Sequence, residues 1–380
     1  MEIFYTDDMF VVDGVSRPGI PFFLDASMRE VRVLNDYLYH VSAIRRLSTD
    51  TRRTYAADLC DFFSFLEANR IAWDRVTGAQ IVAWRDAQLE RRDRPLSRST
   101  VNQRIGAAGR FYDWAVQKKY LAANPFGARH FVRPKGSGVW GSGLRVFSAY
   151  QYSLRLSPKK SRFLRQEELD AFVGAITSKR DALMVWLMRE TGMRRTEVTH
   201  LGRGVVPVLN GVAKGPTLTM TLDPKLTHTK GGKERTVEIT RDLAEFLWDY
   251  IEGERKVLAA GYRSRTGKNP PDHVFLGRTG APLSRGYLDK VFKEVGGRCG
   301  LGRPVTPHMI RHTYGTYEVI AALERGASSL EALAWVQERM GHTSLKTTEK
   351  YLHLAKIVSR KTMDRHQERV TALFKGKLNG

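Results

Sequence analysis

Four separated segments of the chain carry the side chains that attack on a phosphate would need. They are residues 191–198, 229–235, 308–313 and 340–353, and together they supply arginines, lysines, histidines and a tyrosine. Breaking a phosphodiester without a metal ion needs cations on its non-bridging oxygens, a nucleophile in line and a proton for the leaving oxygen. Guanidinium groups bind phosphate oxygens in pairs, and a tyrosine hydroxyl can be the nucleophile. The four segments together therefore contain the residue types that metal-free phosphoryl transfer needs.

Taken singly, each segment has an ordinary structural explanation. The Gly-Met-Arg sequence that ends at Arg194 could be a common turn, and residues 230–233 could be any exposed hairpin tip. His308 and Arg311 lie one helical turn apart and could form a surface pair, while Tyr351 could be a core tyrosine. The functional interpretation depends on all four segments occurring together and in this order.

In this order the segments resemble the tyrosine recombinase family, also called the phage integrase family. The matching sequences are Thr-Gly-Met-Arg at 191–194, Thr-Lys-Gly-Gly-Lys at 229–233, His-Met-Ile-Arg-His-Thr at 308–313, and Gly-His followed by Thr-Thr-Glu-Lys-Tyr within 341–351. The resemblance covers about residues 160–355 strongly and residues 45–126 more loosely. It departs after Leu201, where the family often has a Trp-Asp-Ile-Asp-like entry to a strand.

The resemblance implies a role for each of the matching side chains. Arg194 and Arg311 would hold the scissile phosphate, and His308 and His342 would donate further hydrogen bonds to it. Tyr351 would be the nucleophile that forms a 3′-phosphotyrosyl bond, with His308 as a base toward it. Because a phenol titrates near a pKa of about 10, neighbouring cations must stabilise the phenolate during attack.

Two lysines are candidates for the general acid that protonates the leaving 5′ oxygen. Lys230 is the first candidate, and Lys233 is the alternative three residues further on. Glu197 lies one helical turn after Arg194, so we expect it to orient Arg194 or a histidine rather than to act as a base. The sequence has no Walker loop and no acidic cluster typical of two-metal nucleases, so we expect neither a metal nor a nucleotide cofactor.

The charge of the chain predicts a nucleic-acid partner. Its 380 residues include 62 Lys and Arg against 40 Asp and Glu, a formal net charge of +22, and such an excess favours binding to a polyanion. We expect the partner to be double-stranded DNA. The basic residues expected to contact it outside the catalytic set are Lys233, Arg235, Arg98, Arg104, Arg133, Lys135, Lys159 and Lys160.

Cysteine content and the N-terminal sequence predict the compartment. Cys60 and Cys299 are too few for a disulfide framework or a zinc cluster, and the first residues lack the features of a signal peptide. We therefore expect a cytoplasmic, nucleoid-associated protein without a membrane partner.

Hydrophobic periodicity predicts a mainly helical fold with one small antiparallel β-sheet. Thr217–Leu222 and Arg235–Ile239 are the expected strands. The resemblance implies a helical core-binding domain and an α+β catalytic domain that form a C-shaped clamp on DNA. The expected divisions are an irregular N-terminal arm and first helix at 1–44, a SAM-like DNA-binding domain at 45–126, a basic flexible linker at 127–162, the catalytic domain at 163–358 and a tail at 359–380.

Several functions are compatible with these residues. The first is site-specific recombination through a Holliday junction for a mobile genetic element, with a homotetramer on DNA and with accessory proteins or a second recombinase as further partners. A topoisomerase or a telomere resolvase would use the same chemistry, and a non-catalytic DNA-binding accessory protein is the remaining alternative. The presence of all six expected catalytic residues argues against that last reading. The tail could pack on its own domain or, as the family suggests, dock on a neighbouring protomer.

Overall fold

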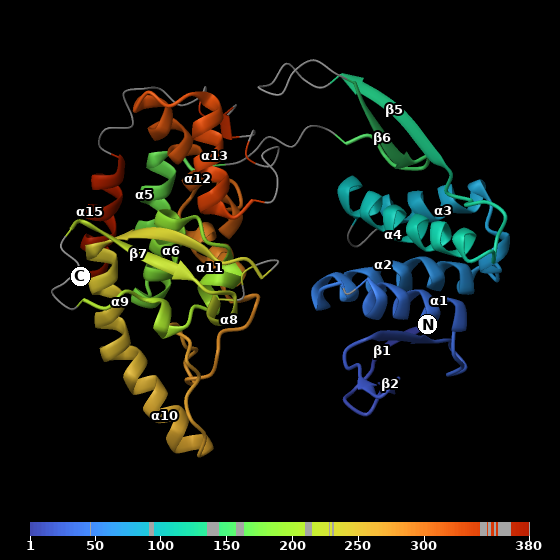
Figure 1. Ribbon diagram of the computed structural model, residues 1–380, viewed down its shortest axis with the longest axis horizontal. Helices are drawn as coiled ribbons and strands as arrows, with labels where there is room; N and C mark the ends of the chain where they lie inside the picture. The colour runs from blue at the N-terminus through green and yellow to red at the C-terminus, as the bar shows by residue number, and fades with distance from the viewer. Residues whose placement is uncertain are drawn as a thin grey trace. The chain divides into compact units, whose positions relative to one another are not determined.

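The chain divides into two compact units, Met1–Pro158 and Lys159–Gly380 (Figure 1). The computed structural model describes residues 1–45, 47–90, 95–134, 144–156, 163–209, 215–227, 229, 232–342, 348, 351–352, 355 and 366–379, with the side chains of 128–149 and 366–369 excepted. No helix within these ranges has both the length and the apolar character that crossing a membrane requires.

The first unit is built on the helices that periodicity predicts. They are α1 (Arg32–Tyr39) with its continuation η1 (His40–Ile44), α2 (Thr49–Ala68), η2 (Trp73–Arg75), α3 (Gly78–Leu89) and α4 (Arg98–Gln117). Thr77 and Gln80 form a capping box at the start of α3, because each side chain bonds to the backbone N–H of the other. Aromatic rings from α2, α3 and α4 fill the core between these helices.

The prediction of an irregular arm at the N-terminus is wrong. Strand β1 (Glu2–Tyr5) pairs antiparallel with β4 (Pro21–Leu24), and β2 (Val11–Val12) pairs with β3 (Val15–Ser16). Asp13 and Gly14 form the turn between β2 and β3 with φ of 51° and 73°, and such a pair is favoured in two-residue hairpins. The strands are too short to show a period in the sequence.

The prediction of a flexible linker at 127–162 is wrong for its described part. Strands β5 (Ala128–Pro134) and β6 (Leu144–Tyr150) pair antiparallel along their whole length. Tyr150 joins this hairpin to α4, since its hydroxyl donates to Asp113 Oδ2 at 2.5 Å. The residues between the strands, and 157–162, lie outside the described residues.

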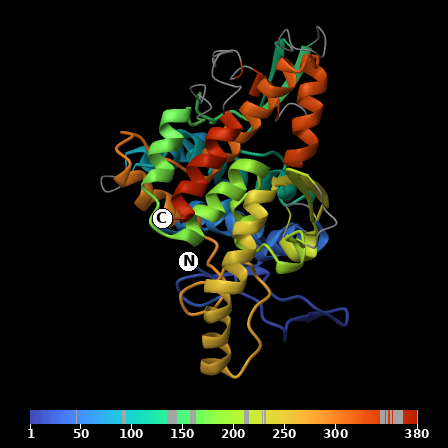
Figure 2. The same ribbon diagram turned by 90° about the vertical axis from the view of Figure 1, so that its left-hand side faces the viewer.

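The second unit surrounds one buried helix, α6 (Lys179–Thr191), of which twelve of thirteen residues are buried. The helices before the sheet are α5 (Gln166–Gly174), α7 (Arg195–Thr199) and η3 (Arg203–Val205). Those after it are α9 (Arg241–Tyr250), η4 (Ile251–Arg255), α10 (Lys256–Thr266), α11 (Tyr287–Arg298), α12 (Pro307–Glu324) and α13 (Ser329–Met340). Figures 1 and 2 both show α10 extending away from the helices around α6.

The two predicted strands of this unit are confirmed. Strand β7 (Thr217–Leu222) pairs antiparallel with β8 (Arg235–Thr240), and buried and exposed residues alternate along both. One face of the hairpin therefore packs on the core. The short helix α8 (Pro224–Thr227) follows β7, and Lys233 lies just before β8.

The C-terminal helix α15 (His366–Asn379) packs on its own domain in this structure. The Phe374 ring stacks on Trp186 of α6 with ring centroids 5.2 Å apart, and Val370 and Leu378 are also buried. Figures 1 and 2 both place α15 beside α5 and α6. Of the two alternatives for the tail, the described residues adopt packing within the chain.

Replacing Phe374 by alanine should destabilise the second unit by about 3 kcal/mol, because the change leaves a cavity against Trp186. Urea unfolding followed by tryptophan fluorescence measures this loss. The exposed Asn379→Ala change in the same helix is the control. An unchanged midpoint for Phe374→Ala would mean that α15 is not docked on α6 in solution.

Candidate active site

Two left-handed glycines fix the backbone around the candidate site. Gly192 ends α6 with φ of 61°, and Gly341 ends α13 with φ of 60°. Glycine adopts this conformation without the steric cost that other residues carry. A side chain at Gly192 would also collide with the ring of Tyr314. The first glycine leads directly to Arg194 at the start of α7, and the second leads to His342.

Glu197 is fully buried and accepts hydrogen bonds from two arginines. The Arg194 backbone N–H donates to Glu197 Oε2 at 2.7 Å, and Arg194 Nη1 donates to Oε1 at 2.9 Å. Arg235 Nη1 and Nη2 donate to Oε1 and Oε2 at 3.0 and 2.6 Å. The arrangement supports the expectation that Glu197 orients Arg194.

The pKa of Glu197 reflects this pairing. Burial alone would raise the pKa of the carboxyl group, but the hydrogen bonds and charge of Arg235, followed by those of Arg194, lower it to about 2. Glu197 is therefore a fixed anion across the physiological pH range and is unsuited to act as a general base.

Arg194 and Arg311 meet at the C-terminal end of α13. Arg311 Nη2 donates to the Met340 carbonyl oxygen at 2.5 Å, and Arg194 Nη2 donates to the next carbonyl oxygen, that of Gly341, at 3.1 Å. Arg311 Nη1 also donates to the Gly192 carbonyl oxygen. Burial, followed by the positive charge of Arg194, lowers the pKa of Arg311 to about 9. Two neighbouring guanidinium groups of this kind favour an added anion.

Tyr351 is fully buried and contacts two histidines, His312 and His342. Its hydroxyl oxygen is 3.1 Å from His312 Nδ1, and the His312 ring centroid is 4.2 Å from that of His308. The His342 ring lies nearly parallel to the Tyr351 ring with centroids 6.2 Å apart. Burial raises the pKa of the phenol to about 12, although the charges of Arg311 and Arg194 oppose this. The phenol is therefore protonated in the chain without DNA.

Glycine at position 315 allows this approach. A Cβ there would lie 2.8 Å from Met340 Sδ and 2.8 Å from Tyr351 Cζ. Only a residue without a side chain lets Tyr351 pack this closely on α12, the helix that also carries His308 and Arg311.

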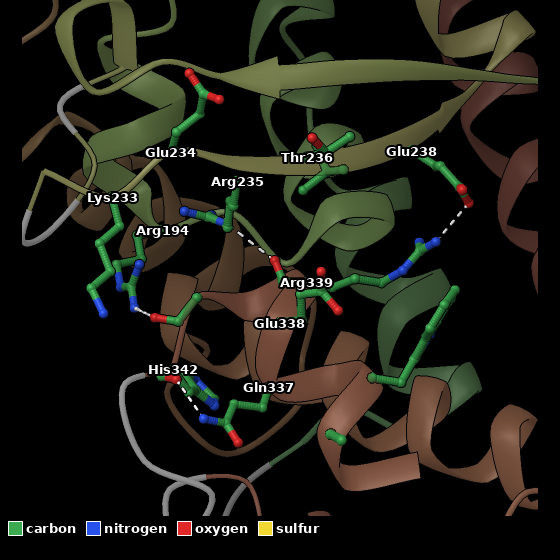
Figure 3. A pocket seen from close by; sticks show the side chains of 14 residues that line it. Arg194, Lys233, Glu234, Arg235, Thr236, Glu238, Gln337, Glu338, Arg339 and His342 are labelled. Carbon is green, nitrogen blue, oxygen red and sulfur yellow. Dashed lines mark hydrogen bonds and ion pairs between the residues drawn. The ribbon is translucent and has the colours of Figure 1, made fainter. Parts of the chain in front are cut away.

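Arg194, Lys233 and His342 line one groove of about 670 Å³ between β8 and α13 (Figure 3). His342 is held at its edge, because Nδ1 lies 3.0 Å from Thr348 Oγ1 and its carbonyl oxygen accepts from Gln337 at 3.0 Å. In Figure 3 the side chains of Lys233 and Arg194 lie next to each other, with His342 below them. Lys230, the first candidate for the general acid, lies outside the described residues.

The structure thus brings together most of the predicted catalytic residues. Arg194, Arg311, His342 and Tyr351 share direct or neighbouring contacts, and His308 reaches Tyr351 through His312. Within the described part of the chain, no group of three His, Cys, Asp or Glu side chains is placed to hold a metal ion.

Two of the predicted DNA contacts are held in ion pairs within the chain. Arg235 is not a surface cation, because its guanidinium is buried against Glu197. Arg104 pairs with Asp61 at 2.5 Å and lies 3.8 Å from Asp58, so nearby carboxylates offset its charge. Arg98 is exposed, with Nη1 3.5 Å from the Arg155 carbonyl oxygen. The described part of the structure does not include Lys135, Lys159, Lys160 or the side chain of Arg133.

Sequence reasoning missed the roles of two residues in the site. The sequence places Arg235 among the surface cations, because a charged residue beside a hairpin loop is usually exposed. The signal for its burial is the alternation of inward and outward residues along β8. His312 contacts the Tyr351 hydroxyl, and its position immediately after Arg311 gives no hint of this.

Comparison with known proteins assigns the family. The phage integrase family matches residues 162–357, just over half of the chain, and the phage integrase N-terminal SAM-like domain matches residues 34–119. The chain therefore belongs to the phage integrase family, whose relatives here are tyrosine recombinases.

Individual relatives cover nearly the whole chain. It is 25% identical over 342 residues to tyrosine recombinase XerD of Staphylococcus aureus, which spans 89% of this chain and 99% of that protein. It is 26% identical to tyrosine recombinase XerC of Bacillus pumilus, over 89% and 97% of the two chains.

Solved structures share the fold. A λ integrase dimer bound to a COC′ core site has a TM-score of 0.55 at 14% identity, covering 84% of this chain and 94% of that one. A XerH recombinase in a post-cleavage complex with palindromic difH substrate has a TM-score of 0.54 at 19% identity, covering 90% and 85%.

The low pKa of Glu197 predicts a pH dependence of stability. Because this pKa lies below its unfolded value of about 4.5, the stabilisation is fully present above pH 4.5 and is lost as the pH falls toward 2. The amount is about 3 kcal/mol. Glu197→Gln should remove this part of the dependence, as measured by urea unfolding at pH 7 and pH 3. The exposed Glu324→Gln change is the control, and identical pH dependence in wild type and Glu197→Gln would contradict the account.

Proposed function

We propose that the chain is a site-specific tyrosine recombinase that cleaves and rejoins DNA through Tyr351, without a metal or nucleotide cofactor. The observation that supports this most is the meeting of Arg194 and Arg311 at consecutive carbonyl groups of residues 340 and 341, next to His342 and Tyr351. Two guanidinium groups beside a tyrosine suit a phosphodiester that is to be attacked by a phenol.

The proposed reaction exchanges one phosphoester bond for another. Tyr351 Oη attacks phosphorus, the bond from phosphorus to the 5′ oxygen breaks, and a 3′-phosphotyrosyl bond forms. The phenol proton leaves toward His308. His312, which contacts both the Tyr351 hydroxyl and the His308 ring, offers a route for it. Lys230 or Lys233 gives a proton to the 5′ oxygen. A 5′ hydroxyl from another strand then attacks the phosphotyrosine, and because the bond energy is retained, rejoining needs no ATP.

DNA binding has to change the surroundings of Tyr351. The phenol is fully buried before DNA arrives, and its pKa is near 12. A phosphate placed on Arg194 and Arg311 requires the hydroxyl to turn toward the phosphorus. We propose that the exposed cations Lys233 and Arg98, together with Arg133, Lys135, Lys159 and Lys160, contribute salt-dependent contacts to the DNA backbone.

We further propose that strand exchange proceeds through a Holliday junction in a homotetramer that clamps DNA, in the cytoplasm and on behalf of a mobile genetic element. A λ integrase tetramer bound to a Holliday junction and the Tn1549 transposon integrase in complex with a circular intermediate DNA have TM-scores of 0.53 and 0.54 with this chain. A topoisomerase or telomere resolvase would share the cleavage step and differ in the DNA products. If a second recombinase or accessory proteins are needed, this chain alone would cleave DNA but not complete strand exchange.

The chemistry predicts a covalent intermediate that forms in EDTA. Nicked suicide duplexes carrying candidate element ends should give a protein–DNA band on denaturing gels with wild type and none with Tyr351→Phe, because only the phenol can form the phosphotyrosine. DNA binding by Tyr351→Phe is measured in parallel as the control. A covalent band that persists with Tyr351→Phe would show that Tyr351 is not the nucleophile. A wild-type chain that binds DNA but never cleaves it would favour an accessory DNA-binding protein.

The two candidate general acids can be separated with a substrate whose 5′-bridging oxygen is replaced by sulfur. A thiolate leaves without a proton, so the loss caused by removing the true general acid should shrink by at least about tenfold on this substrate. Lys230→Ala is expected to show that rescue in single-turnover cleavage. Rescue of Lys233→Ala alone would transfer the role to Lys233.

A further inference from the structure

Arg235 connects three separate elements of the catalytic unit. It begins β8, two residues after Lys233, and only 9% of it is exposed. Its two terminal nitrogens donate to both oxygens of Glu197 at 3.0 and 2.6 Å, and Nε donates to the Arg339 carbonyl oxygen near the end of α13 at 3.0 Å. Figure 3 shows this last hydrogen bond as a dashed line between Arg235 and Arg339.

Each carboxylate oxygen of Glu197 already accepts two hydrogen bonds. It accepts two hydrogen bonds from Arg235 and two from Arg194, which fills the usual capacity of a carboxylate. The position of the carboxylate is therefore set by Arg235 on one side, and the position of the Arg194 guanidinium is set by the carboxylate on the other.

A second contact joins Arg235 to the turn that carries His342. A Cβ added at Gly341 would lie 3.2 Å from Arg235 Cδ, so the Arg235 side chain packs closely on the Gly341 backbone. The carbonyl oxygen of the same Gly341 accepts from Arg194 Nη2 at 3.1 Å. Movement of Arg235 would thus displace both the partner of Arg194 and the turn before His342.

We infer that Arg235 is a positioning residue: through Glu197 it sets the guanidinium of Arg194 on the scissile phosphate, and it ties the β7–β8 loop to the turn that carries His342. This inference rests on the proposed function. A consequence is that engagement of DNA by the β7–β8 loop, which holds Lys233, is mechanically linked to the phosphate-binding arginine.

Lysine cannot replace Arg235 in this role. Its single ammonium group lacks the planar fork that fills both oxygens of Glu197, and the Arg339 carbonyl oxygen would lose its donor. Arg235→Lys keeps the charge and removes the geometry. Misplacing a reacting group by about 1 Å costs roughly a hundredfold in rate, so we expect a loss of about ten- to a hundredfold in single-turnover cleavage.

A buried arginine elsewhere in the same unit provides a matched control. Arg180 is 7% exposed, and it donates to Asp181 at 3.2 Å and to the Leu276 carbonyl oxygen at 2.7 Å. Neither of these partners belongs to the candidate site. Arg180→Lys therefore removes a similar network without a route to Arg194. Thermal unfolding of both variants shows how much stability each change costs.

The decisive test compares two suicide duplexes, one with a normal scissile phosphate and one with a neutral methylphosphonate there. A methylphosphonate lacks the negative charge that Arg194 stabilises, so a misplaced Arg194 costs less on it. Arg235→Lys should lose about ten- to a hundredfold in cleavage on the phosphate and clearly less on the methylphosphonate, with unchanged binding of DNA. For Arg180→Lys, the cleavage rate relative to wild type should be the same on both substrates.

The opposite results are equally clear. An equal loss of Arg235→Lys on both substrates, or no loss on either, would overturn the positioning role and leave a purely structural one. If Arg235→Lys fails to fold, Glu197→Gln gives the same comparison, because it weakens the hold on Arg194 without shortening a side chain. Absence of a covalent product from wild type on both substrates would overturn the proposed function, and the inference with it, irrespective of the variants.

Discussion

The catalytic unit depends on a buried carboxylate that holds two arginines in place. Like charges repel most strongly in a low-dielectric interior, and Arg194, Arg235 and Arg311 are brought close together there. Glu197 offsets part of this charge and fixes the geometry through four hydrogen bonds. The positive charge that remains favours binding of an anion. In the proposed function this anion is the scissile phosphate, and the charges that hold it are in place before DNA binds.

Backbone carbonyl groups complete this arrangement. The C-terminal ends of α6 and α13 present carbonyl oxygens to Arg311, and the end of α13 also binds Arg194. Helix C-termini favour cations, so the ends of α6 and α13 stabilise Arg311, and the end of α13 adds to the hold that Glu197 has on Arg194. The glycines that end these helices let the chain turn sharply into Arg194 and His342. Tyr351 packs into the same centre with its hydroxyl protonated, so the proposed attack requires DNA binding to change the surroundings of the phenol.

Sequence reasoning grouped the candidate site residues better than it located the scaffold around them. The order of the motifs predicted Arg194, Arg311, His342 and Tyr351 as one group, and the structure places these four residues close together. It did not find the inward orientation of Arg235, because a charged residue beside a hairpin loop is usually exposed, although the alternation along β8 pointed to burial. The strands β1 to β6 were not predicted. Strands β2 and β3 are only two residues long, whereas β1 pairs with β4, and β5 with β6, across longer stretches of sequence.

Peptide mapping of the trapped complex tests the central claim most directly. Wild-type chain is reacted in EDTA with a suicide duplex, the complex is digested with protease and nuclease, and the modified peptide is identified by mass spectrometry. The account predicts a nucleotide joined by its 3′ phosphate to Tyr351. A nucleotide attached to any other residue, or through a 5′ phosphate, would contradict it.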